Sequence, residues 1–119
     1  MPHVMLIEDD PMVRLLVAHH LLDHGWRVTT LKDGCDLDRM MQDEPVDLLL
    51  IDLGLPHVDG LSLVENLREK GINTPVLILT AYELPHLLAM VEGSGANDLL
   101  QKPFEEDDLF NRMQRLIAA

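Results

Sequence analysis

The stretch VDLLLID, residues 46–52, decides the expected fold of this chain. The run Val46–Ile51 is short and mostly apolar, which is typical of a strand whose two faces are both covered by helices in a parallel sheet. Asp52 follows at once, so one carboxylate is expected where this strand leaves the core. The same seven residues therefore predict a buried strand and a polar group at its carboxyl end.

Three other apolar runs also end in polar groups. The carboxyl ends of parallel strands share one edge of an open sheet, and ligands bind at that edge, so these groups are expected near Asp52. Together they offer carboxylates, a hydroxyl and an ammonium, which predicts a metal site beside one potentially nucleophilic aspartate. The groups are Glu8-Asp9-Asp10 after Val4–Ile7, Thr80 after Val76–Leu79, and Lys102 after Leu99-Leu100.

Strand-like and helix-like segments alternate along the whole chain. Five successive strand-helix units predict an α/β fold, a three-layer, doubly wound (βα)5 arrangement with a five-stranded parallel sheet and right-handed crossovers. The expected strands are Val4–Ile7, Arg27–Leu31, Val46–Ile51, Pro75–Leu79 and Asp98–Gln101. The expected helices run from Pro11 to near Gly25, over Asp36–Gln42, onward from Gly60, over Leu84–Val91, and over Glu105–Ile117.

Length and composition predict one domain over residues 1–119. The chain is 47% apolar and 25% charged, which is ordinary for a globular protein. Its net charge of -12 argues against direct contact with a nucleic acid backbone. A solitary Cys35 fits a reducing compartment. No apolar run approaches the roughly 20 residues of a membrane helix, and a signal peptide is not evident, so we expect a cytoplasmic domain without membrane contact.

The carboxylates grouped around Asp52 suit a hard divalent cation. Two or three carboxylates and a backbone carbonyl would bind Mg²⁺, or Mn²⁺ in its place. The cation and the Lys102 ammonium together would neutralise charge on a phosphoryl group during transfer. Asp52 is then the natural acceptor, since carboxylates act as covalent nucleophiles, and the Thr80 hydroxyl could donate to a phosphoryl oxygen.

Four motifs in this order resemble the receiver domain of two-component response regulators, over essentially the whole chain. They are LIEDDPMVR at 6–14, LLLIDLGLPHVDG at 48–60, LILTA at 77–81 and GANDLLQKPF at 95–104. The resemblance implies the flavodoxin-like, CheY-like form of the predicted fold. It also implies a signal transduction domain that promotes its own phosphorylation and dephosphorylation without being a turnover enzyme.

The resemblance assigns a role to each residue of the site. A sensor histidine kinase or phosphotransfer protein would phosphorylate Asp52, and an output domain or target protein would respond. Asp9, Asp52 and the backbone carbonyl of Gly54 would bind Mg²⁺, with Glu8 acting through water. Thr80 and Lys102 would contact the phosphoryl group, and the Lys102–Pro103 bond is expected to be cis. Glu8 and Asp9 align with the family's acidic pair because Arg14 and Gly25 then also fall on family positions.

One departure from the family concerns the switch, which is expected to use the face formed by residues 80–102. Family members usually carry Tyr or Phe where this chain has Leu99, so we expect signalling to rely more on Thr80 and the helix after it. That helix is predicted to be unusually apolar, and part of it could be a partner surface. A phosphorylation-dependent homodimer remains open, but the charged dimer contacts that family members form through this helix are not expected, because no residue between Glu83 and Glu92 carries a formal charge. Its candidate interface residues are Leu84, Leu87, Leu88 and Met90.

Two other functions compete with this interpretation. A pseudo-receiver scaffold would bind partners without phosphate, but Glu8, Asp9, Asp52, Thr80 and Lys102 are all intact. A magnesium-dependent phosphatase resembling the haloacid dehalogenase family would need an aspartate where this chain has Gly54.

Several polar residues near the motifs are expected to be structural. Asp10 is expected to act as a helix cap or solvated neighbour rather than a ligand. Five of the six histidines lack paired ligand spacing and are expected to be surface or interface residues. They are His19, His20, His24, His57 and His86. Cys35 is expected to be inert packing.

Overall fold

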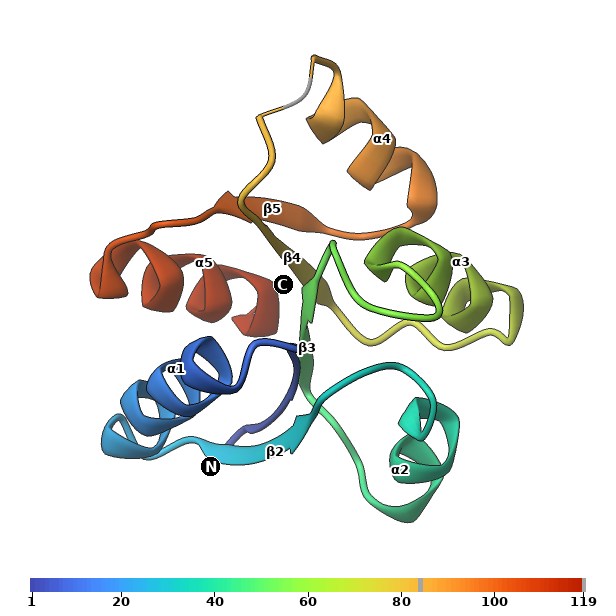
Figure 1. Cartoon of the computed structure of the whole chain (residues 1–119). Helices are drawn as coiled ribbons and strands as arrows, with labels where there is room; N and C mark the ends of the chain where they lie inside the picture. The colour runs from blue at the N-terminus through green and yellow to red at the C-terminus, as the bar shows by residue number, and fades with distance from the viewer. Residues whose placement is uncertain (84, 119) are drawn as a thin grey trace.

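A computed structural model describes residues 1–83 and 85–118 of the chain. The described residues form five parallel strands in the order β2-β1-β3-β4-β5, alternating with helices (Figure 1), which confirms the predicted α/β fold. The strands are β1 His3–Ile7, β2 Arg27–Leu31, β3 Leu48–Asp52, β4 Val76–Thr80 and β5 Asp98–Gln101. The helices are α1 Pro11–Asp23, α2 Leu37–Asp43, α3 Gly60–Glu69, α4 Leu87–Ser94 and α5 Glu106–Ala118.

The sheet lies between two layers of helices. Figure 1 shows α1 and α5 on one face and α2, α3 and α4 on the other. Each face has its own apolar cluster, one including Leu21 and Met113 and the other including Val64 and Val91. Every residue of β1, β3 and β4 is buried, because alternate side chains of these central strands enter opposite clusters.

The three acidic residues Glu8, Asp9 and Asp10 have different roles, because the last of them caps α1. Asp10 is the N-cap of α1, and its Oδ1 accepts hydrogen bonds from the backbone N–H groups of Met12 and Val13, at 2.9 and 3.2 Å. Pro11 takes the first helical position, where a missing N–H is tolerated. The prediction that Asp10 caps a helix is confirmed, and Glu8 and Asp9 are left at the end of β1.

The predicted bounds of the fourth helix were wrong. The sequence pattern placed this helix at Leu84–Val91, whereas α4 covers Leu87–Ser94. His86 precedes it with a left-handed φ of 61°, and Gly95 follows it with a φ of 101°, so the backbone is not helical on either side. A histidine gives no local signal for such a conformation, which Gly adopts readily.

With these bounds, some apolar residues of α4 are buried in the core and others lie at the surface. Leu87 is buried in the core, whereas Leu88 and Met90 are 51% and 52% exposed. Leu84 lies outside the described residues. Of the candidate interface residues, Leu88 and Met90 are therefore the two that the described structure places at the surface. Among the described helices, none combines the length and the apolar character needed to cross a membrane.

Candidate functional site

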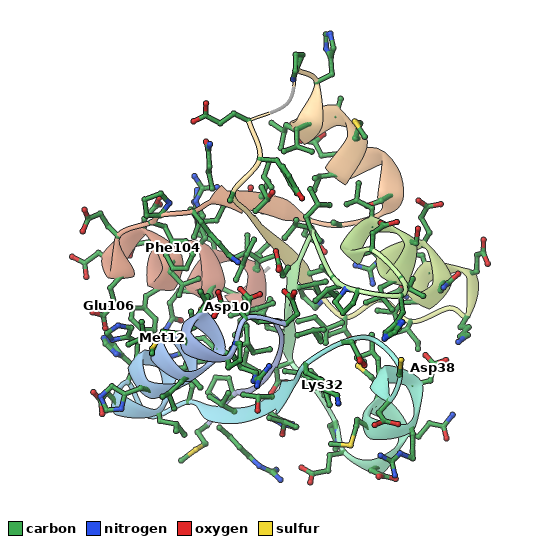
Figure 2. All side chains as sticks on the ribbon, viewed as in Figure 1. Asp10, Met12, Lys32, Asp38, Phe104 and Glu106 are labelled. Atoms are coloured by element: carbon green, nitrogen blue, oxygen red, sulfur yellow. The ribbon has the colours of Figure 1, made fainter. Side chains whose placement is uncertain are left out.

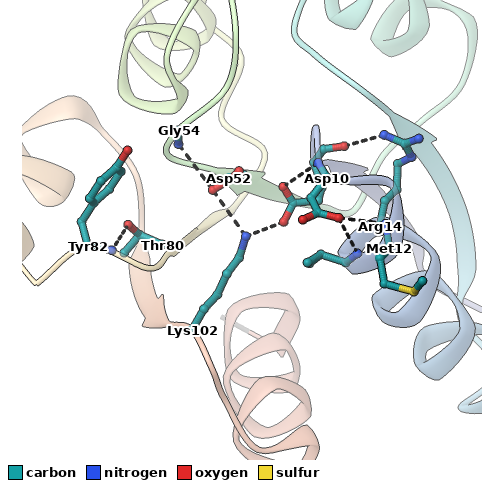
Figure 3. A network of polar contacts seen from close by, with 10 residues as sticks. Asp10, Met12, Arg14, Asp52, Gly54, Thr80, Tyr82 and Lys102 are labelled. Atoms are coloured by element: carbon teal, nitrogen blue, oxygen red, sulfur yellow. Dashed lines mark hydrogen bonds and ion pairs between the residues drawn. The ribbon is translucent and has the colours of Figure 1, made fainter.

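Asp52 ends β3, the central strand, and its side chain opens onto the carboxyl edge of the sheet. The residue is only 8% exposed. Its Oδ1 accepts a hydrogen bond from the backbone N–H of Gly54 at 3.4 Å and lies 3.5 Å from the Nζ of Lys102 (Figure 3). The carboxylate is thus held between its own loop and an ammonium that follows β5.

The Nζ of Lys102 also contacts the carboxyl group of Glu8, whose side chain is almost completely buried. The backbone of Lys102 donates to the carbonyl of Thr80 at 2.7 Å, so its position follows from the pairing of β5 with β4. The guanidinium of Arg14 donates to the carbonyl of Glu8 at 2.8 Å and steadies the turn after β1. The predicted cis bond between Lys102 and Pro103 is present.

The carboxylates of Glu8, Asp9 and Asp52 converge on one point. Each offers an oxygen, and these oxygens all lie within 4.8 Å of one another. Asp9 is exposed, whereas the other two are buried. An all-oxygen donor set of this kind fits a hard divalent cation such as Mg²⁺, and an unpaired cluster would suffer repulsion between its charges.

These groups line an open cleft of about 440 Å³. Thr80 is buried beside it, and its hydroxyl oxygen accepts a hydrogen bond from the backbone N–H of Tyr82 at 3.0 Å (Figure 3), which leaves the hydroxyl proton available to donate elsewhere. The sequence patterns did not predict that Val13 and Ala81 reach this cleft. The lining residues are Glu8, Asp9, Asp10, Val13, Asp52, Gly54, Ala81, Tyr82 and Lys102.

The pKa values of the two buried carboxyl groups, Glu8 and Asp52, shift in opposite directions. The pKa of Glu8 is raised from 4.5 to about 7, first by burial and then by its hydrogen bond with Asp52, although Lys102 acts to lower it. Burial acts to raise the pKa of Asp52, but the hydrogen bond with Glu8 and the charge of Lys102 outweigh it, so this pKa is lowered. The two shifts run in opposite directions, so Asp52 is the stronger acid of the two carboxyls.

Cys35 does not match its expected role. Its side chain is exposed rather than packed. The structure also brings His57 close to Asp33 and Cys35, which the distance of His57 along the sequence did not indicate.

Residues 4–114 match the sequence profile described as the response regulator receiver domain. The chain therefore belongs to this family, and it is a receiver domain of two-component signalling rather than a turnover enzyme. The virulence transcriptional regulatory protein PhoP of Salmonella choleraesuis is 37% identical over 117 residues, which are 98% of this chain and 52% of PhoP. The transcriptional regulatory protein PhoP of Escherichia coli is 33% identical over 96% of this chain and 51% of that protein. The chain thus spans about half the length of these relatives.

Solved structures show the same fold. The receiver domain of the Francisella response regulator 1452 superposes with a TM-score of 0.93 at 31% identity, covering 99% of this chain and 98% of that one. The receiver domain of the sensor histidine kinase PA1611 from Pseudomonas aeruginosa superposes with a TM-score of 0.88 at 32% identity, again covering 99% and 98% of the two chains. That structure holds a magnesium ion coordinated in its active-site cleft.

We predict that Gly60→Ala destabilises the fold and displaces the backbone at Asp52 and Leu53. A Cβ atom at residue 60 would lie 2.6 Å from the backbone carbonyl oxygen of Asp52 and 3.0 Å from the Cα of Leu53, and neither backbone atom can move freely. Overpacking of this kind costs about 1–3 kcal/mol, which urea denaturation would measure. Gly54→Ala is the matched control, because its Cβ would make only ordinary contacts at 3.6 Å with the Tyr82 ring. Equal effects of the two substitutions would contradict this account.

We predict that Glu8 makes the stability of the metal-free protein depend on pH. The folded pKa of about 7 exceeds the ordinary value of 4.5, so between these values the folded protein holds a proton that the unfolded chain has released. The contribution of Glu8 is fully present below pH about 4.5 and is lost as pH rises through about 7.

Urea denaturation in a chelating buffer at several pH values tests this prediction. Wild-type protein should lose free energy of unfolding relative to Glu8→Gln as pH rises across that range, whereas the exposed-site control Glu65→Gln should follow the wild type. Parallel pH profiles for wild type and Glu8→Gln would show that the proton is not held on Glu8.

Proposed function

We propose that this chain is a phosphoacceptor, with Asp52 receiving a phosphoryl group from a phosphorylated histidine of a sensor kinase or phosphotransfer protein. The observation that carries the proposal is the position of the Asp52 carboxyl group, between the Lys102 ammonium and the acidic pair Glu8 and Asp9 in an open cleft. A pseudo-receiver scaffold would have no need of this charge arrangement. Family membership also removes the support for a phosphatase.

The transfer forms an acyl phosphate. A carboxylate oxygen of Asp52 attacks phosphorus, the bond between phosphorus and the histidine nitrogen breaks, and the imidazole leaves with the electron pair of that bond. The Lys102 ammonium stabilises charge on the phosphoryl oxygens through its position 3.5 Å from Asp52. The Thr80 hydroxyl would donate to a phosphoryl oxygen once the group is attached.

The same residues would hold a divalent cation. Asp9, Asp52 and the backbone carbonyl of Gly54 would bind Mg²⁺, or Mn²⁺, with Glu8 acting through water. When bound, the cation supplies positive charge that neutralises the phosphoryl oxygens. The magnesium ion in the PA1611 receiver domain supports this assignment, as does the all-oxygen character of the cluster here.

Residues 1–119 would act as one receiver unit in the cytoplasm, controlling an output domain or a separate target protein. The PhoP relatives, described as transcriptional regulators, are about twice as long as the region they share with this chain. The acidic net charge of -12 leaves any contact with DNA to another domain. Leu88 and Met90 offer an exposed apolar surface to a partner or to a second phosphorylated copy.

Phosphorylation would act through the face formed by residues 80–102. The bond from the Tyr82 backbone to the Thr80 hydroxyl couples Thr80 to the loop before α4. Leu99 packs partly buried against the cluster under α4, and it has no aromatic ring that could exchange between inner and outer positions. Thr80 and the segment after it therefore transmit the conformational change that phosphorylation causes.

We predict that acetyl phosphate and Mg²⁺ add one phosphoryl group to wild-type protein and none to Asp52→Asn. Mass spectrometry of the intact protein measures the gain, and borohydride trapping locates the acyl phosphate. Asp10→Asn is the matched control, because asparagine retains the capping oxygen that Asp10 offers to α1. A phosphoryl group on Asp52→Asn, or its absence from both other proteins, would overturn the assignment.

We also predict where the conformational change is largest. Beryllofluoride with Mg²⁺, an analogue of the phosphorylated state, should shift the amide NMR signals of residues 80–91 more than that of Leu99. Asp52→Asn should show no such shifts under the same conditions. The largest shifts at Leu99 would contradict the proposed role of Thr80.

A further inference from the structure

A second group of metal-ligating side chains lies away from the phosphoacceptor residues. Asp33 and Cys35 belong to the loop between β2 and α2, and His57 belongs to the loop between β3 and α3 (Figure 1). Each offers one ligand atom, a carboxylate oxygen, a thiol sulfur and an imidazole nitrogen, and these atoms all lie within 4.8 Å of one another. Within the described residues, this group and the Glu8 cluster are the two that bring three such atoms so close.

The two groups differ in chemical character. Glu8, Asp9 and Asp52 offer oxygen alone, which suits Mg²⁺. Sulfur and imidazole nitrogen beside one carboxylate are instead the ligands preferred by zinc and by other borderline divalent cations. We propose that Asp33, Cys35 and His57 form a binding site for a transition-metal dication of the Zn²⁺ class.

The local structure suits a three-ligand site with one open position. Cys35 and His57 are exposed and Asp33 is half-buried, so a cation can enter from solvent and keep a water molecule as its fourth ligand. The backbone N–H of Cys35 donates to the Oδ1 of Asp33 at 3.0 Å, which holds the carboxylate next to the thiol. Ligand atoms on one zinc ion are about 3.5–4 Å apart, given bonds of about 2.0–2.3 Å, so modest side-chain rotations bring the three together.

Charge balance also favours a dication here. Binding releases the thiol proton to solvent as the metal–sulfur bond forms, which leaves a thiolate, a carboxylate and a neutral imidazole. Their summed charge of about -2 matches Zn²⁺, and the net charge of -12 attracts cations to the whole domain. Figure 2 labels Lys32 and Asp38, which stand on either side of Asp33 and Cys35 in the sequence.

A bound cation would join the loop after β2 to the loop after β3. The second of these loops includes Gly54, whose backbone N–H donates to the Oδ1 of Asp52. Occupancy of this site would therefore restrain the loop that borders the phosphoacceptor cleft.

A competing site must be distinguished by experiment. His20 and His24 both approach Glu106, with nitrogen–oxygen separations of 3.5 and 3.6 Å between α1 and α5. Figure 2 places Glu106 beside α1, far from Lys32. This histidine pair offers no sulfur, so a metal bound there would lack a thiolate signature.

The test is a titration of the 119-residue chain with Co²⁺, as a spectroscopic substitute for Zn²⁺, in the presence of saturating Mg²⁺ and a phosphine reductant. Wild type should bind one Co²⁺ with a thiolate-to-cobalt charge-transfer band, and Zn²⁺ should displace it. Cys35→Ser should lose the band, and both Cys35→Ser and His57→Asn should weaken Zn²⁺ binding by about tenfold or more in calorimetry. Asparagine is chosen because it tolerates the left-handed φ of 70° at residue 57.

The double variant His20→Asn/His24→Asn is the matched control and should retain both the band and the Zn²⁺ affinity. Circular dichroism confirms that each variant is folded. The proposal fails if wild type shows no thiolate band, or if Zn²⁺ binding is lost in the double variant but unchanged in Cys35→Ser. Either failure would leave phosphorylation of Asp52 unaffected, so it is separable from a failure of the proposed function.

Discussion

The site depends on the contacts of one ammonium group with two buried carboxyl groups. The ammonium of Lys102 lies between the carboxyl groups of Glu8 and Asp52. Two carboxylates close together in a poorly solvated place repel each other and resist ionisation. A nearby positive charge favours the ionised form, and the charge of Lys102 helps to lower the pKa of Asp52. A carboxyl group can therefore lie buried here and still ionise readily.

The position of Lys102 is a consequence of sheet topology. β5 lies at one edge of the sheet and pairs with β4, which pairs with β3. The backbone hydrogen bond from the Lys102 N–H to the Thr80 carbonyl continues the pairing of β5 with β4 past the end of β5. β1 delivers Glu8 from the other side of β3. Because all strands are parallel, every one of these residues emerges at the same edge.

Ligand chemistry divides the carboxyl edge into two regions. At the ends of β1 and β3 the donors are oxygen atoms of Glu8, Asp9 and Asp52. Between the loops that follow β2 and β3, a thiol and an imidazole join one carboxylate. The loop after β3 takes part in both regions, through Gly54 at its start and His57 further along.

The amino-acid sequence by itself determined the order of strands and helices, the parallel sheet and the residues expected at its carboxyl edge. Short apolar runs and helical spacing are local patterns, and a parallel arrangement sends the ends of such runs to one edge whatever the details of packing. Tertiary structure alone decided the start of α4, the burial of Leu87 and the meeting of Cys35 with His57. These features depend on the left-handed backbone conformation of His86 and on the packing of separate loops. No periodic pattern in the sequence encodes either of them.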